Sequence, residues 1–168
     1  SRLLDMPRPA FQVDLVVPGP PEQVWARLWD LGRHTTAIPL TTVAADPATT
    51  NLTTSAEPDA PDVPSPSGLR QDVRFTARTA LGPVGFDDDM VVRTWDPPRR
   101  AVVDKVGRLL SGSIEVDLSP VGPNTRLRWA QTFGAGMNTL RVPDALAGLA
   151  ARPVRAAYRQ ALLRITRP

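Results

Sequence analysis

The feature of this sequence that most constrains its fold is an alternation of apolar and polar residues that runs, with interruptions, from residue 69 to residue 133. Successive side chains of a β-strand point to opposite faces, so this alternation predicts strands that each bury one face. Gly and Pro residues interrupt the alternation at 81–83, 96–98 and 120–124, as they do at turns. The segment therefore predicts an antiparallel meander of short strands.

Seven strands are predicted in all. Five belong to the meander, and two precede it. The predicted ranges are 11–17, 40–45, 69–79, 84–95, 99–108, 110–118 and 125–133, with the fourth strand bent around 85–89. The inward side chains are Phe11, Val13, Leu15 and Val17 on the first strand, and Leu127, Trp129, Gln131 and Phe133 on the last.

Apolar residues at helical spacing predict two short helices after the first strand. The first begins at Pro21, a residue type favoured at helix starts, and its apolar stripe contains Trp25 and Trp29. These two indoles are expected to pack the helix onto the sheet. The second short helix is predicted over 33–38, before a proline.

A long helix is predicted over 143–165 at the end of the chain. Pro153 lies in its interior and has no N–H group, so we expect a kink there. The apolar side of this helix consists of Leu146, Leu149, Ala150, Val154, Ala157, Tyr158, Ala161, Leu162 and Ile165. Its other side carries most of its arginines.

The segment 46–68 differs from the rest of the chain. It contains five prolines, four acidic residues, many Ser and Thr residues and no basic residue. Such a composition buries too little apolar surface to order itself, and long loops of this kind in compact domains are often functional. We expect a mobile loop that acts as a lid, within a single domain that covers 1–168.

Charge and composition exclude several classes of function. The net charge is only +3, and arginine supplies 19 of the 20 basic residues without a tight basic run, so we expect no nucleic-acid partner. The chain has no cysteine and a single histidine, so we expect no metal and no cofactor. No apolar run approaches the length that spans a bilayer, and no signal peptide is visible, so we expect no stable membrane insertion and a cytoplasmic location. The preference for arginine over lysine, together with the many Ala and Pro residues, is typical of GC-rich genomes such as those of actinobacteria.

Several stretches resemble a known family. They are Pro-Glu-Gln-Val-Trp at 21–25, Arg-His-Thr-Thr-Ala-Ile-Pro-Leu at 33–40, Gly-Pro-Val-Gly-Phe-Asp-Asp at 82–88, Val-Arg-Thr-Trp-Asp-Pro-Pro-Arg-Arg at 92–100, and the Arg-rich last helix. Together they resemble the START-related helix-grip superfamily and, within it, the bacterial polyketide cyclase/dehydrase (SRPBCC) family. The resemblance implies an α+β helix-grip fold, in which a seven-stranded curved antiparallel sheet wraps around a long C-terminal helix. The long loop at 46–68 departs from the family pattern.

The candidate site residues follow from the inward faces of these elements. His34 is the only side chain that titrates near neutral pH, so it is the candidate acid–base catalyst; the alternative is a helix-end residue satisfied by backbone or water. Asp88 is expected to face the cavity, while Asp87 and Asp89 face solvent, because alternate strand residues point to opposite faces. The candidate ligand-binding residues are Phe75, Phe86, Asp88, Met90, Trp129, Gln131, Phe133, Leu146, Leu149 and Tyr158.

Three functions remain open at this stage. The first is the binding of a hydrophobic small molecule, polyketide-like, aromatic or lipid-like, in an internal cavity bordered by the loops 46–68, 95–99, 119–124 and 134–142. The second is a polyketide cyclase, aromatase or dehydratase in which His34 acts with Gln131 or Asp88. The third is an interaction module that uses the arginines of the last helix. The chain is expected to be a monomer or homodimer.

Overall fold

The computed structural model describes residues 11–50, 66–107, 110–132, 134–135 and 144–168, the last of these segments with side chains from residue 152 onward. Its elements are β1 (Phe11–Pro18), α1 (Pro21–Leu28), α2 (Leu31–Ala37), β2 (Thr41–Ala45), α3 (Pro47–Thr50), β3 (Arg74–Leu81), β4 (Val84–Asp96), β5 (Arg100–Val106), β6 (Leu110–Val121), β7 (Asn124–Gln131), β8 (Gly134–Ala135) and α4 (Asp144–Ile165). Seven strands form one antiparallel sheet in the order β1-β7-β6-β5-β4-β3-β2. The predicted α+β class and seven-stranded sheet are confirmed. The two-residue strand β8, which pairs with the start of β6, was not predicted.

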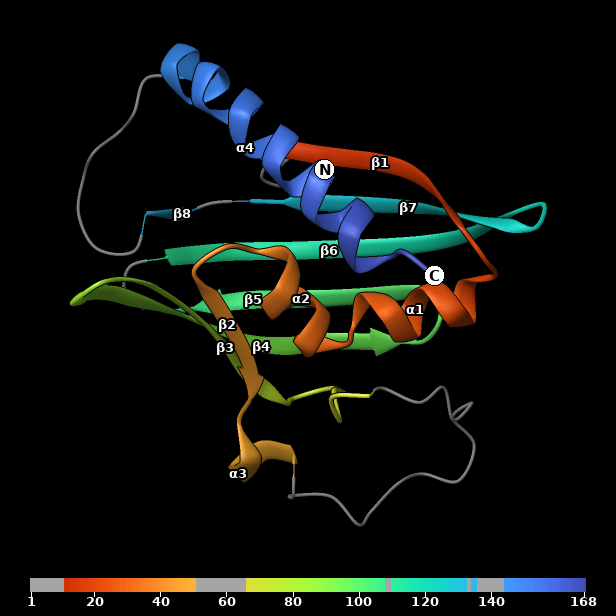
Figure 1. Cartoon of the computed structure of the whole chain (residues 1–168), viewed down its shortest axis with the longest axis horizontal. Helices are drawn as coiled ribbons and strands as arrows, with labels where there is room; N and C mark the ends of the chain where they lie inside the picture. Colours follow the sequence, from red (N-terminus) through yellow and green to blue (C-terminus); the bar gives the residue numbers. More distant parts are fainter. Residues whose placement is uncertain (1–10, 51–65, 108–109, 133, 136–143) are drawn as a thin grey trace, which may run out of the picture.

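The sheet curves, and the helices cover one of its faces. Figure 1 shows α1 and α2 in front of the strands, with α4 running across the sheet near β1. The predicted inward residues of the first strand, Phe11, Val13, Leu15 and Val17, are all buried. The chain therefore has a helix-grip fold, in which one face of a curved sheet holds the helices.

Two hairpins of the meander use the same loop. Gly82 and Pro83 join β3 to β4, and Gly122 and Pro123 join β6 to β7. Both glycines have φ close to +60°, which only glycine adopts without steric cost. The turns predicted from these Gly-Pro pairs are confirmed.

The strand predicted from residue 69 begins only at Arg74. Leu69 and Val73 are buried, as the alternation requires, but they belong to a turn that places Asp72 at φ +66°. Apolar residues that pack on the core from a loop produced the same pattern as a strand. The bend predicted at 85–89 was also misplaced, because the β3–β4 register is continuous there and the irregularity lies at Val92–Thr94.

Among the described side chains of the last helix, those buried in the core lie near its C-terminal end. Leu162 and Ile165 are buried, whereas residues 152–157 are all exposed. Val154 and Ala157 belong to the predicted apolar side of the helix, but in the structure both are exposed. Pro153 lies inside the helix as predicted.

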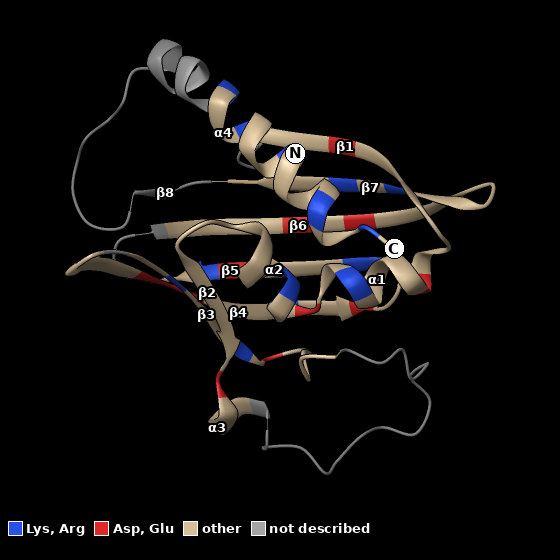
Figure 2. Ribbon diagram, viewed as in Figure 1, with Lys and Arg blue, Asp and Glu red and all other residues tan. Residues whose placement is uncertain are grey.

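Charges on the strands are paired across neighbouring strands. Arg100 contacts Glu115 and Asp117 at 3.1 and 3.2 Å, and Arg93 contacts Asp104 at 2.8 Å. Figure 2 shows positive and negative segments side by side on adjacent strands, whereas residues 152–165 of α4 include arginines and no acidic residue. None of the helices in the described part of the chain is long and apolar enough to cross a membrane.

Candidate functional site

One end of the sheet's inner face is filled by tryptophans. Trp25 lies in α1, and Trp29 follows the last residue of that helix. Both contact Trp95 of β4, and the ring centroids of the three residues are 4.8 to 5.8 Å apart. The predicted packing role of Trp25 and Trp29 is confirmed by their burial. The contribution of Trp95 was not predicted, because an alternation that turns Asp88 and Met90 inward turns Trp95 outward, and only the register shift at Val92–Thr94 brings it back to the inner face. No space for a ligand remains between these rings.

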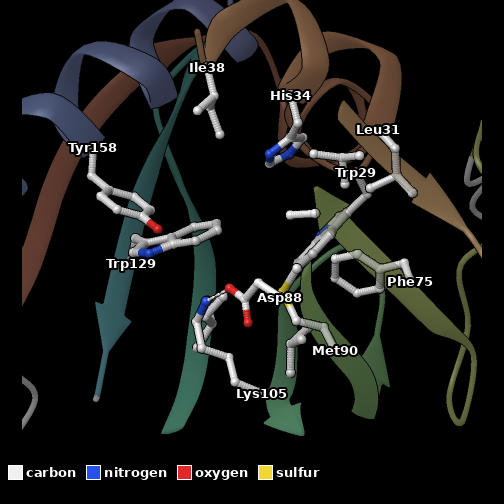
Figure 3. A pocket seen from close by; sticks show the side chains of 14 residues that line it. Trp29, Leu31, His34, Ile38, Phe75, Asp88, Met90, Lys105, Trp129 and Tyr158 are labelled. Atoms are coloured by element: carbon white, nitrogen blue, oxygen red, sulfur yellow. Dashed lines mark hydrogen bonds and ion pairs between the residues drawn. The ribbon is translucent and has the colours of Figure 1, made fainter. Parts of the chain in front are cut away.

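A cavity of about 80 Å³ lies at the other end of the same face. In the close view of Figure 3, His34 points into it from α2, Asp88 and Lys105 lie opposite, and Trp129 and Tyr158 stand to one side of Phe75 and Met90. The described residues that line the cavity are Trp29, Leu31, His34, Ile38, Val43, Phe75, Ala77, Asp88, Met90, Val103, Lys105, Ile114, Trp129 and Tyr158. Most of this lining is apolar, with a few polar groups turned inward.

An ion pair between Asp88 and Lys105 lies in the cavity wall. The two residues come from neighbouring strands, and Lys105 is in register with Met90, two positions beyond Asp88 on the same face. The side chains of Lys105 and Asp88 are only 4% and 10% exposed, and Asp88 Oδ1 has no hydrogen-bond partner. On β6 the residue in register with Lys105 is Gly112, which has no side chain to fill the adjacent space. The wall thus holds a charge pair with an unused acceptor.

The neighbours of Asp88 turn to the other face, as predicted. Asp87 pairs with Arg78 at 3.0 Å, and the hydroxyl of Thr76 donates to Asp89 at 2.7 Å. The sequence analysis placed Asp88 correctly but overlooked Lys105. The sequence does contain a feature that singles out Lys105: it is the only lysine among 20 Lys and Arg residues. Among the described residues, no three His, Asp or Glu side chains gather in a way that could hold a metal ion.

A second polar group borders the cavity on β7 and α4. The indole N–H of Trp129 donates to Gln131 Oε1 at 3.4 Å, and the ring of Tyr158 lies 6.1 Å from that of Trp129. Gln131 is 0% exposed, and its amide contacts both the indole N–H of Trp129 and the hydroxyl of Tyr158, as buried amides require partners. Burial raises the pKa of Tyr158, and the charge of Asp88 adds to this, while a polar contact with Gln131 opposes it. Tyr158 therefore stays a neutral hydroxyl at physiological pH.

His34 contributes one free nitrogen to the cavity. Its Nε2 lies 2.6 Å from the carbonyl oxygen of Leu28, which can only accept, so Nε2 carries the proton and Nδ1 keeps a lone pair. Burial lowers the pKa of His34, and the hydrogen bond to Leu28 and the charge of Asp30 oppose this only in part. The ring is therefore neutral at neutral pH, with a base of modest strength facing the cavity.

The structure brings together six of the predicted site residues. His34, Phe75, Asp88, Met90, Trp129 and Tyr158 line the cavity. Gln131 is buried beside Trp129. Phe86 does not line the cavity: it is 41% exposed and lies at the start of β4, close to the turn that joins β3 to β4.

Two other groups of predictions have different outcomes. Phe133 lies outside the described residues, as do the side chains of Leu146 and Leu149. The loops 95–99 and 119–124 contribute no residue to the described lining, because they lie at the tryptophan-filled end of the sheet, so their predicted place at the mouth is wrong. Within the predicted loop at 46–68, residues Pro47–Thr50 form the single turn α3, while 51–65 lie outside the described residues.

Comparisons with known proteins support the fold. No protein-family model and no curated protein matches the chain. Among solved structures it is similar to TTHA0849 from Thermus thermophilus, with 13% identity, a TM-score of 0.63 and 92% of each chain covered. It is also similar to Ara h 8.0201, with 9% identity, a TM-score of 0.59 and coverage of 92% and 95%. A third is SA2116 from Staphylococcus aureus, a protein of unknown function, with 6% identity, a TM-score of 0.62 and coverage of 92% and 90%. Identities this low establish the fold alone.

Proposed function

We propose that this domain binds a hydrophobic small molecule in the cavity between the sheet and α2. The observation that carries the proposal is the cavity itself, which combines apolar walls with a few inward polar groups, as ligand sites commonly do. One atom of those groups, Asp88 Oδ1, has no hydrogen-bond partner among the described residues. A ligand with a polar end and an apolar body would satisfy it, because leaving it unpaired costs free energy.

The size of the cavity limits what enters it. A volume of about 80 Å³ is well below the ~300 Å³ at which pockets for drug-sized ligands begin. It accommodates a group of a few non-hydrogen atoms. The walls must therefore move apart for a larger ligand, or part of that ligand must stay outside the cavity. The lid predicted at 46–68 stays a prediction, and unchanged ligand exchange after deletion of 48–66 would refute it.

Two measurements test the binding proposal. Native mass spectrometry of freshly purified protein should detect a co-purified hydrophobic compound. Calorimetric titration with benzyl alcohol should give saturable binding that weakens at least about tenfold in Ala77→Leu, which fills the cavity wall, a loss of about 1.4 kcal/mol. Ala44→Leu is the matched control, because Ala44 is exposed on the neighbouring strand β2. Equal affinities in the two variants would refute the site.

A second function is supported by one specific observation, the free Nδ1 of His34 in the cavity lining. Like the polyketide cyclases that the sequence resembles, the domain would then use His34 as a general base on a linear poly-β-ketone substrate. His34→Gln should abolish cyclisation or dehydration while leaving binding intact, because Gln keeps a donor for the Leu28 carbonyl. Full turnover in this variant would rule out His34 as the base.

A further inference from the structure

We propose that Lys105 is a covalent attachment point in the cavity, whose amine forms an imine with a small aldehyde or ketone. This inference rests on the proposed ligand-binding function and names the chemical class of the ligand. It draws on three features of the described residues: the identity of the residue at position 105, the carboxylate beside it and the space next to it.

The residue type at position 105 is unusual for this chain. Arginine occupies the other 19 basic positions, and every arginine in an ion pair of the described part is at least about one-third exposed. The lysine occupies the buried position, with its side chain 4% exposed. A guanidinium keeps its proton in proteins, whereas a lysine amine can lose it and become a nucleophile when it is desolvated. Lys105, the basic residue that is not an arginine, is thus also the basic side chain that can react with a carbonyl group.

The carboxylate of Asp88 supplies the proton chemistry that this reaction needs. Asp88 Oδ2 accepts a hydrogen bond from Lys105 Nζ inside an apolar wall. The proton that the Lys105 ammonium must lose before it can attack a carbonyl carbon therefore has an acceptor in direct contact.

The reaction balances within this pair. Asp88 takes one proton from the Lys105 ammonium, and the amine so formed attacks the carbonyl carbon. As the C–N bond forms and the C=O π bond breaks, a second proton moves from the nitrogen to the oxygen, which becomes a hydroxyl. Protonated Asp88 gives its proton to that hydroxyl, which leaves as water, and the C=N bond forms. The product is an iminium on Lys105 beside the Asp88 carboxylate. The total charge is unchanged, because one ammonium has become one iminium and the carboxylate is restored.

The surroundings favour a neutral carbonyl over a charged ligand. A carboxylate ligand would face Asp88, and a cationic ligand would face Lys105, since the two groups are joined by a hydrogen bond. Lys105 and Asp88 both line the cavity, so a small ligand inside it lies within reach of the amine. A carbonyl compound with a small apolar body matches these groups.

The experiment uses the presence of a single lysine in the sequence. The protein, prepared without tag lysines, is incubated with benzaldehyde and cyanoborohydride at neutral pH, and the adduct is located by intact-mass measurement and peptide mapping. The chain's α-amine is the internal comparison. We expect Lys105 to gain a benzyl group at least about tenfold faster than the α-amine, because the cavity holds the aldehyde beside it. Excess benzyl alcohol should suppress labelling of Lys105 but not of the α-amine.

Two controls separate this inference from the binding proposal. Lys105→Arg keeps the charge pair with Asp88 but cannot form an imine, so it should lose the internal adduct and keep the one on the α-amine. If benzyl alcohol binds saturably and Lys105 is labelled no faster than the α-amine, the imine inference is overturned and the binding site stands. If neither compound binds, the proposed function fails as well. Because labelling of Lys105 is compared with labelling of the α-amine in the same wild-type protein, this test does not depend on whether a variant folds.

Discussion

The inner face of the sheet has a filled end and a hollow end, built on the same strands. At the filled end, β4 presents Trp95 to Trp25 and Trp29; at the hollow end, the same strand presents Asp88 and Met90 to the cavity. The difference lies in the side chains, since backbone pairing between β4 and β5 continues from one end to the other apart from one bulge. In this fold, the size of a few inward side chains thus decides whether the space between sheet and helices is filled or contains a cavity.

The two ends also differ in how they treat polar atoms. The indole N–H of Trp25 is buried without a partner among the described residues, and Trp25 does not line the cavity. Asp88 Oδ1 is equally unpartnered among those residues, and Asp88 does line the cavity. Unsatisfied polar atoms therefore point to a ligand only where volume accompanies them.

The largest effect that tests this comparison is expected at the filled end. Trp25→Ala should lower the free energy of unfolding by about 4 kcal/mol, because a large cavity opens in a closely packed cluster. Met90→Ala at the hollow end should cost only about 2 kcal/mol, since the lost volume merges with space that already exists. Urea unfolding monitored by circular dichroism measures both. Equal losses would mean that the two ends are packed alike.

Next in size is the effect of breaking the ion pair. Lys105→Met should lower the free energy of unfolding by about 3 kcal/mol, because it leaves the Asp88 carboxylate buried without a partner. The double variant Asp88→Leu with Lys105→Met removes both charges and should recover most of that loss. Urea midpoints of the three proteins provide the test. A loss below about 1 kcal/mol in the single variant would show that water reaches the pair freely.

The smallest expected effect concerns His34 and pH. Its pKa is lowered from 6.5 by burial, so below pH 6.5 the unfolded chain binds a proton that the folded protein does not. Stability should therefore fall as the pH drops through this range, by at most about 1.4 kcal/mol per pH unit from this residue. His34→Gln removes the titrating group and should show a smaller fall between about pH 7.5 and about pH 5.5. Identical slopes would contradict the burial of a neutral ring.

Much of the fold could be predicted because it depends on local periodicity. The inward residues of β1, the Gly-Pro hairpins and the position of Asp88 follow from the two-residue repeat of a strand and from turn chemistry. Errors arose where another structure produces the same pattern. Leu69 and Val73 are buried from a turn, and Val154 occupies an apolar helix position but is exposed in the structure.

The candidate site was harder to predict, because periodicity gives the face of a residue but not its position along the sheet. Phe86 and Asp88 share a face, yet of the two only Asp88 lines the cavity. The pairing of Asp88 with Lys105 depends on the register between β4 and β5, which alternation within one strand does not determine. The position of the cavity depends on which end of the sheet the tryptophans fill. To predict that end, one must know how α1 packs on the sheet.

The uneven burial of α4 has a consequence for how long its hydrogen bonds survive. Residues 152–157 are all exposed, while Leu162 and Ile165 are fixed in the core. Amide hydrogens of 154–157 should exchange with deuterium after local opening alone, whereas those of 161–166 should wait for the sheet and helix to separate. The backbone hydrogen bonds of α4 thus have two different lifetimes. They are short-lived where water surrounds the helix and long-lived where the helix packs on the sheet.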